Sequence, residues 1–279
     1  MTMIRVALIF LLTSTCAQSW KNWALTTRCS DVHFTFTTAA ANRVANNPPK
    51  DLFSDPGAIH AFLRQPVAYH TVTGTFAIYG QLCHPVHRPQ TPKLQLLVHG
   101  PTHNHTDWTL AIDRLGQGLS SRPDPVIMVQ DPLQTQLLHL MAREIRDHGL
   151  LRIRSGCAEG VDGLKLIYVG HSFGSGLGVH LAAAHPDDFD ALVLTGIATG
   201  RGNPQPGSLL ARWGPASQTG FPPDTPAGYL VSANKTGREA LYWSARTDFD
   251  ADMFERDWAG QGTITQELPL SMKRQRSPI

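Results

Sequence analysis

Long apolar runs, dense charge and abundant cysteine are all missing from this sequence. No apolar run reaches the roughly 18 residues that a membrane-spanning helix needs, so we expect no membrane span. Charged residues make up 16% of the chain, and 24 Lys and Arg against 22 Asp and Glu leave a net charge of +2. This balance gives no electrostatic reason to expect a nucleic-acid partner. Four cysteines in 279 residues also exclude a small domain built on many disulfides.

The first 17 residues have the pattern of a secretion signal. Arg5 supplies a positive charge, residues 6–12 form a short apolar stretch, and small residues at 15–17 suit cleavage before Gln18. The alternative is a buried N-terminal strand or helix. We predict that residues 1–17 are a signal peptide and that the protein is secreted.

Secretion also fits the cysteines that remain after cleavage, which are Cys29, Cys83 and Cys157. An oxidising compartment would pair two of them and leave one odd thiol. We favour a Cys29–Cys83 disulfide, because each of these cysteines lies beside a predicted early strand. Two N-glycosylation sequons, at Asn104 and Asn234, are compatible with an exported glycoprotein but are common by chance.

Strand and helix patterns alternate along the first two thirds of the chain. Such alternation is typical of an α/β protein with a mostly parallel sheet and helices on both of its faces. We expect this core to span residues 18–197. One helix is predicted to begin with Asp131 as its N-cap and Pro132 in its first turn. The predicted strands are 33–38, 71–82, 94–98, 109–112, 164–169 and 191–195, and the predicted helices are 131–149 and 172–185.

Residues 198–279 have a different texture. The stretch 200–228 is rich in Gly and Pro, and weak helical patterns follow at 238–243 and 251–258. Such a segment could form a cap laid over a site, or it could be a loosely ordered tail. We treat residues 198–279 as a cap-like segment with an irregular end.

Residues 170–174 read Gly-His-Ser-Phe-Gly, a Gly-x-Ser-x-Gly pattern. A buried strand runs into this motif and a helix of small residues leaves it, as a nucleophile elbow requires. The sharp turn would hold Ser172 in strained geometry at the helix N-terminus, where backbone N–H groups favour a developing oxyanion. The alternative is a glycine-rich turn in which Ser172 only caps the helix.

Taken together, these motifs resemble the α/β-hydrolase superfamily, in particular its secreted fungal members. The resemblance runs from about Cys29 to about Gly262. It rests on His99-Gly100 after the third strand, on residues 113–120 (DRLGQGLS) after the fourth, on the elbow, and on residues 188–196 as the sixth strand. It implies that Ser172 is the nucleophile, that the Phe173 N–H is one oxyanion donor, and that the turn at Gly100 supplies the other.

The catalytic base that this family requires is not evident in the sequence. The family order is Ser, then Asp or Glu, then His, yet all 13 histidines lie at or before His185. His180 and His185 follow Ser172 on the exit helix, roughly 12 and 20 Å along its axis, and so neither can be the base. Aspartates 248, 250 and 252 lie in the cap-like segment, and we interpret them as surface charges. We therefore expect a chain truncated at its C-terminal end.

The loop after Gly100 departs from the family in two further ways. Only 12 residues separate Gly100 from Asp113, too few for the crossover helix that the family has there. We expect one face of the sheet to be partly bare as a result. Pro101 follows Gly100 and has no N–H to donate to an oxyanion.

Three histidines crowd this region, at positions 99, 103 and 105. One of them reaching Ser172 would form a serine–histidine dyad. His103, His105 and Asp107 could instead suggest a metal site, but they lack helical ligand spacing and a fourth ligand. We predict no metal there and interpret the segment as a solvated polar loop.

The leading functional hypothesis is a secreted serine hydrolase of esterase, lactonase or amidase type that acts on a small-molecule carbonyl substrate. Its chemistry needs water and no cofactor. Without a base, we predict weak or absent turnover. The alternative is a non-catalytic remnant or binding protein of the same ancestry. A third interpretation is an imperfect gene model, since residues 268–279 show neither strand nor helix periodicity. The sequence indicates neither the substrate nor the oligomeric state.

Overall fold

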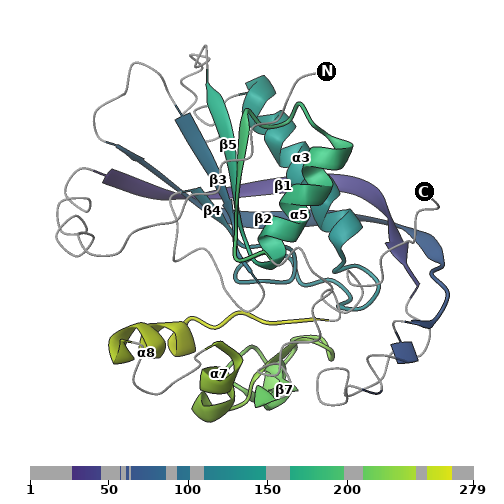
Figure 1. Cartoon of the computed structure of the whole chain (residues 1–279), viewed down its shortest axis with the longest axis vertical. Helices are drawn as coiled ribbons and strands as arrows, with labels where there is room; N and C mark the ends of the chain where they lie inside the picture. The colour runs from purple at the N-terminus through teal and green to yellow at the C-terminus, as the bar shows by residue number, and fades with distance from the viewer. Residues whose placement is uncertain are drawn as a thin grey trace.

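The fold was analysed in a computed structural model, which describes residues 27–44, 57, 61–62, 64–85, 93–100, 110–148, 164–197, 210–242 and 250–265. The predicted signal peptide, Cys157 and residues 101–109, which include Asn104, lie outside these ranges. Six strands form one sheet in the order β1-β2-β4-β3-β5-β6, and two short strands, β7 and β8, form a second sheet (Figure 1).

The sheet begins with a pair of long antiparallel strands, β1 (Thr27–Arg43) and β2 (Tyr69–Pro85). Their side chains alternate between a buried and an exposed face, as a sheet with one solvated face requires. Val32 and Phe34 of β1 are buried together with Phe76 and Ile78 of β2. These strands extend beyond the predicted ones at both ends, because each pairs with the other along its whole length.

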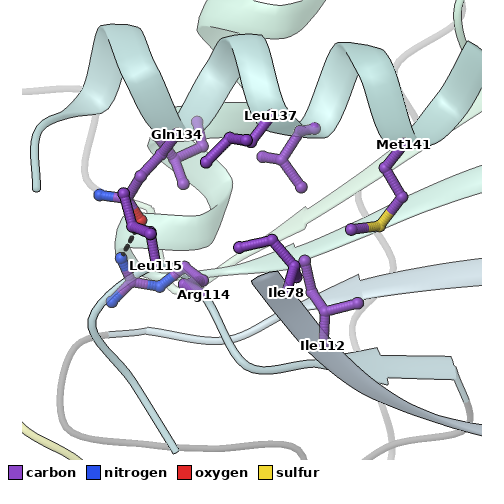
Figure 2. Close-up of a pocket in the computed structure, with 9 residues that line it drawn as sticks. Ile78, Ile112, Arg114, Leu115, Gln134, Leu137 and Met141 are labelled. Carbon is purple, nitrogen blue, oxygen red and sulfur yellow. Dashed lines mark hydrogen bonds between the residues drawn. The ribbon is translucent and has the colours of Figure 1, made fainter. Parts of the chain in front are cut away.

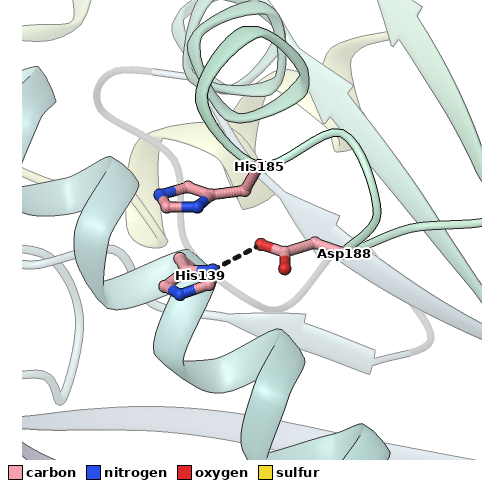
Figure 3. Close-up of side chains that lie close together, drawn as sticks. All are labelled: His139, His185 and Asp188. Carbon is pink, nitrogen blue, oxygen red and sulfur yellow. Dashed lines mark hydrogen bonds and ion pairs between the residues drawn. The ribbon is translucent and has the colours of Figure 1, made fainter.

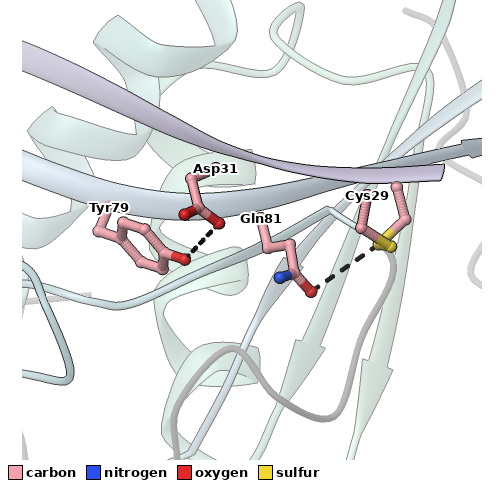
Figure 4. Close-up of a disulfide and its surroundings, with 5 residues drawn as sticks. Cys29, Asp31, Tyr79 and Gln81 are labelled. Carbon is pink, nitrogen blue, oxygen red and sulfur yellow. Dashed lines mark hydrogen bonds between the residues drawn. A yellow bond between two sulfur atoms is a disulfide. The ribbon is translucent and has the colours of Figure 1, made fainter.

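A disulfide joins Cys29 to Cys83, as the sequence predicts (Figure 4). The two cysteines are direct cross-strand partners in the β1–β2 register. On the same pair of strands, the hydroxyl of Tyr79 donates a hydrogen bond to Asp31 at 2.7 Å. Burial, together with this carboxylate, raises the pKa of Tyr79 to about 12. Tyr79 therefore remains a neutral hydrogen-bond donor at physiological pH.

The remaining strands of the large sheet carry the parallel part of the fold. These are β4 (Leu110–Ile112), β3 (Lys93–Val98), β5 (Lys165–His171) and β6 (Ala191–Thr195). Strand β4 is antiparallel to β2, whereas the pairings β3–β4, β3–β5 and β5–β6 are parallel. This confirms the predicted α/β architecture with a mostly parallel sheet.

Two helices, α3 (Asp131–His148) and α5 (Phe173–Ala184), contact each other and cover one face of this sheet. Leu166 and Tyr168 of β5 are buried in the core beneath them, whereas Ile167 and Val169, on the other face, are only partly buried. In the described ranges, the helices with extensive contacts to the large sheet are α3 and α5, and no comparable helix is seen to cover its other face. The connection between β3 and β4 explains this difference, because it has too few residues to form the crossover helix that would cover the other face.

Asp131 is the first residue of α3 rather than its N-cap, which corrects the prediction. Its carboxylate pairs with Arg43 of β1 and lies 3.3 Å from the ring of His180 on α5. The backbone carbonyl of Gln130 accepts the first helical hydrogen bond, from the N–H of Gln134. Asp131 is thus used to join three elements, a role that local capping rules do not reveal.

The C-terminal segment contains further short elements. They are β7 (Trp213–Pro215), the 3-10 turn η2 (Ala216–Gln218), β8 (Leu230–Ser232), α7 (Lys235–Tyr242) and α8 (Ala251–Ala259). The hydroxyl of Thr263 donates to the carbonyl of Gly116, and that of Tyr229 to the carbonyl of Pro123. These bonds fasten the segment to the loop that follows β4. The domain boundary at residue 197 stays a prediction.

Every described helix is too short or too polar to span a lipid bilayer.

Candidate nucleophile elbow

Ser172 sits at the turn between β5 and α5, with backbone angles φ 52° and ψ −115°. Such angles are costly for a residue with a Cβ and persist only where the surroundings enforce them. The N–H of Ser172 donates to the carbonyl of Thr195 on β6 at 2.9 Å, which helps to hold the turn. Strand, strained serine and helix therefore follow one another as a nucleophile elbow requires.

The two motif glycines lie at positions where backbone segments approach each other closely. A Cβ added to Gly174 would lie 2.1 Å from the carbonyl oxygen of Val98 on β3. A Cβ added to Gly170 would lie 2.6 Å from the carbonyl oxygen of Gly174. Both distances are far below van der Waals contact, so any side chain at either position would force α5 away from the sheet. The spacing of the motif is thus a packing requirement.

The side chain of Ser172 makes no capping hydrogen bond to α5. This observation argues against the alternative in which the serine only caps the helix. Gly100 lies beside it, since a Cβ on Gly100 would be 3.1 Å from the Cβ of Ser172. Phe173 is the first residue of α5, where backbone N–H groups have no intrahelical acceptor. The fold thus brings Ser172, Phe173 and Gly100 together, as the resemblance implied.

A buried arginine organises the strand end beside this turn. Arg114 is 2% exposed, and its Nε donates to the carbonyl of His99 at 3.0 Å. Its NH2 group lies 3.4 Å from the carbonyl of Gly100, and its guanidinium stacks 4.7 Å from the ring centroid of Phe173. Arg114 therefore contacts both residues that were expected to provide oxyanion donors. From the sequence alone, Arg114 is a member of the DRLGQGLS motif without a predicted role.

The far side of the Arg114 guanidinium donates to Gln134 of α3 at 2.7 Å (Figure 2). These two polar residues close one end of a small cavity between α3 and the sheet, which is otherwise apolar. Ile78, Leu137 and Met141 are among its lining residues. The cavity belongs to the core packing that fixes Arg114.

The carboxylate of Asp113 closes the loop that contains DRLGQGLS. It accepts a hydrogen bond from the N–H of Leu119 at 2.7 Å, and the hydroxyl of Ser120 donates to the Asp113 carbonyl at 2.6 Å. Gly118 has φ 44°, and a Cβ there would collide with the Asp113 carboxylate at 1.9 Å. The motif therefore encodes a rigid loop beside the elbow, and its glycine permits the close approach.

Two hydrogen-bonding side chains, those of Ser175 and Tyr168, secure the elbow from beneath. The hydroxyl of Ser175 lies 2.8 Å from the carbonyl of Gly170 and 2.7 Å from that of Thr195, and it accepts the Thr195 N–H at 3.0 Å. The hydroxyl of Tyr168 donates to the carbonyl of Gly174 at 2.6 Å. Complete burial raises the pKa of Tyr168 above its ordinary value, so this hydroxyl stays protonated.

His99 does not serve as a base for Ser172. Its Nδ1 lies 2.7 Å from the Gly100 carbonyl, to which it donates, and its Nε2 accepts the N–H of Arg114 at 3.1 Å. Both ring nitrogens are therefore engaged in holding the strand end. These partners assign a neutral ring with its proton on Nδ1. The serine–histidine dyad is thereby excluded for His99, while His103 and His105 lie outside the described residues.

His171 precedes Ser172 and packs its ring against Gly196, where a Cβ would lie 2.6 Å from Cε1. Its Nδ1 lies 3.1 Å from the hydroxyl of Thr195. Burial lowers the pKa of His171, so the ring is neutral at pH 7. His180 contacts Asp131 and the ring of His185 stacks on that of His139, which agrees with the exclusion of both as bases.

The remaining predicted positions have structural roles in the C-terminal segment. Asn234 accepts the N–H of Gly237 at 2.9 Å at the start of α7, and so it caps this helix besides beginning a sequon. Asp250 caps α8 by accepting the N–H groups of Asp252 and Met253. Asp250 and Asp252 are both exposed, in keeping with surface charges, whereas residue 248 and Pro101 lie outside the described ranges.

No family model matches the chain, and no curated protein matches it. Among solved structures, an α/β-hydrolase from Novosphingobium aromaticivorans aligns at 16% identity with a TM-score of 0.39, over 71% of this chain and 65% of that one. A putative hydrolase from Rickettsia typhi aligns at 14% identity with a TM-score of 0.44, over 87% of this chain and 74% of that one.

A haloalkane dehalogenase variant from Bradyrhizobium elkanii aligns at 14% identity with a TM-score of 0.35. The alignment covers 71% of this chain and 64% of the dehalogenase, so the chain spans just under two thirds of the length of this structure and of the Novosphingobium one. A shared fold carries no information about substrate.

Proposed function

We propose that this chain is a secreted serine hydrolase of α/β-hydrolase type in which Ser172 is the nucleophile. The proposal depends on one observation above all. Ser172 is held at φ 52° with no capping bond, between Phe173 at a helix N-terminus and Gly100. A helix N-cap has no need of this strain, whereas a nucleophile presented to a substrate does.

On this proposal the substrate is a small molecule with an ester, lactone or amide carbonyl. The Ser172 oxygen attacks the carbonyl carbon, and the N–H of Phe173 donates to the developing oxyanion. Collapse of the tetrahedral intermediate expels the leaving group, and water then hydrolyses the acyl-enzyme. Within the described residues His99 is engaged with Arg114 and Gly100, so on this proposal the serine proton passes to solvent. Turnover is accordingly slow.

Export is part of the same proposal. Residues 1–17 would be removed as a signal peptide, and the Cys29–Cys83 disulfide is the kind of bond that persists outside the reducing cytosol. Glycans would attach at Asn104 and Asn234. The side-chain oxygen of Asn234 would continue to cap α7, since the sugar is carried on the nitrogen.

One observation favours a second candidate, a non-catalytic binding or remnant protein. His99, which directly follows β3, uses both ring nitrogens for the fold. A site of this kind would keep the elbow and its supporting loop while lacking a base to activate the hydroxyl. The hydrolase and the binding protein differ in whether Ser172 reacts at all.

A fluorophosphonate probe separates the two candidates, because it forms a covalent P–O bond with an activated serine and expels fluoride. We expect the wild type to be labelled slowly at Ser172, the Ser172→Ala variant not at all, and the Ser217→Ala variant like the wild type. Intact-protein mass spectrometry over a time course measures the labelled fraction. Wild-type protein that melts cooperatively yet takes up no probe would eliminate the hydrolase and leave the binding protein.

A further inference from the structure

Two histidines and an aspartate meet in a cluster that the proposed hydrolase chemistry does not use. His139 lies on α3, His185 caps the C-terminal end of α5, and Asp188 lies in the turn before β6 (Figure 3). One ligand atom from each of them falls within 4.8 Å of the other two. The sequence places His185 and Asp188 three residues apart, but only the packing of α3 against α5 adds His139.

The three side chains are held tightly together. The imidazole rings of His139 and His185 stack with their centroids 3.7 Å apart and their planes 13° from parallel. Nδ1 of His139 lies 2.8 Å from a carboxylate oxygen of Asp188. The Asp188 side chain is only 6% exposed, while that of His139 is 22% exposed. A buried carboxylate and two partly buried imidazoles thus bring three potential ligand groups together where solvent can reach them.

The charges around this cluster permit a cation. The guanidinium of Arg146 on α3 lies beside this cluster, and its Nε donates to the backbone carbonyl of Asp188 at 2.7 Å. The same guanidinium is paired with Asp190, whose carboxylate also binds Lys165. Its charge is thus countered locally, and the carboxylate of Asp188 remains directed at His139 (Figure 3).

We propose that His139, His185 and Asp188 bind a divalent transition-metal ion, with Zn²⁺ as the best-matched cation. Imidazole nitrogens with one carboxylate suit zinc and its neighbours better than Mg²⁺ or Ca²⁺, which prefer oxygen ligands. Two neutral imidazoles and one carboxylate leave the fourth position of a tetrahedral ion to water. The ion replaces the hydrogen bond between His139 and Asp188, and the two rings turn out of their parallel stack so that one nitrogen of each points at the ion at about 2.1 Å. Bound there, it bridges α3 to the end of α5.

Zinc titration of the full chain, after treatment with a chelator, tests this site. The variants are His139→Gln, His185→Gln and Asp188→Asn, each close in shape to the native residue. His180→Gln is the matched control, because His180 lies on α5 with its side chain 38% exposed and pairs with Asp131. We expect the wild type and the control to bind one more Zn²⁺ than the three variants do, measured by competition with a chromophoric chelator.

Loss of a direct ligand should weaken Zn²⁺ binding at this site by about 100-fold or more, given the 10–100-fold cost of losing only an outer-shell partner. Co²⁺ in place of Zn²⁺ should give visible absorption of a four-coordinate ion in the wild type and lose it in all three variants. Thermal melts without metal establish that each variant is folded. Equal Zn²⁺ stoichiometry and affinity in folded wild type and folded variants would overturn the proposal. Both readouts are independent of the reactivity of Ser172.

Discussion

Ser172 and Arg212 are the non-glycine residues of the described chain with positive φ, and Ser172 is the one located at a strand–helix turn in the core. Its strain of about 1–3 kcal/mol is held by surrounding bonds rather than by its own side chain. The Thr195 carbonyl takes its N–H, and Ser175 ties the flanking Gly170 to β6. The residue that would do chemistry is therefore also a place where stability is lost.

From this strain we predict how substitutions of Ser172 change the free energy of unfolding. Ser172→Gly should be more stable than Ser172→Ala by about 1 kcal/mol, because glycine adopts φ 52° without a Cβ penalty. At Val179, an exposed position inside α5, the order should reverse, with alanine about 1 kcal/mol more stable than glycine. Urea denaturation of the four variants measures both differences. If alanine were favoured equally at both positions, Ser172 would carry no strain.

At the scale of elements, α5 is set onto the sheet by its glycines rather than by large side chains. Gly174 meets the Val98 carbonyl, and Gly178 lies against the ring of Tyr168. Gly176 differs from both, because a Cβ there would have nothing within 4 Å. Two of these glycines therefore allow α5 to approach the sheet closely, whereas the third faces open space.

These glycines provide a matched pair of variants. Gly174→Ala should lower the free energy of unfolding by about 3 kcal/mol, since a Cβ 2.1 Å from a backbone oxygen forces the helix outward. Gly176→Ala should raise it by about 1 kcal/mol, because alanine is the better helix former and meets no obstacle. Urea denaturation again gives both values. Similar effects from the two substitutions would show that α5 does not pack on β3 as described.

At the scale of the whole molecule, Asp190 connects segments that are distant in sequence. Its carboxylate accepts hydrogen bonds from Lys165 and from the N–H of Leu166 on β5, and it pairs with Arg146 of α3. Partial burial acts to raise the pKa of Asp190, but these bonds outweigh it and lower the pKa to about 2. The ionised carboxylate is thus the form that the fold stabilises.

A pH dependence of stability follows from this shift. The unfolded-state pKa is about 3.9, so the stabilisation by Asp190 is complete above that value and is lost as the pH falls towards 2. Asp190→Asn should therefore lower the free energy of unfolding at pH 6 by about 1 kcal/mol, a value reduced for solvent screening, and should have almost no effect near pH 2. Urea denaturation at the two pH values makes the comparison. A constant difference would mean that the pKa of Asp190 is not lowered.

Much of this protein was determined by patterns local to the sequence. Alternating apolar residues placed β1 and β2 and hence the Cys29–Cys83 pair, and the Gly-x-Ser-x-Gly spacing located the elbow at Ser172. Such features depend on backbone sterics and on periodicities of a few residues, which a single sequence displays.

Only the tertiary structure decided the roles of residues whose partners are remote. It engaged both nitrogens of His99 with Gly100 and Arg114, buried Arg114 against Phe173, and made Asp131 a joint between β1, α3 and α5. It also brought His139 to His185 and Asp188. These contacts form because helices and strands pack face to face, and no local rule specifies which side chains then meet.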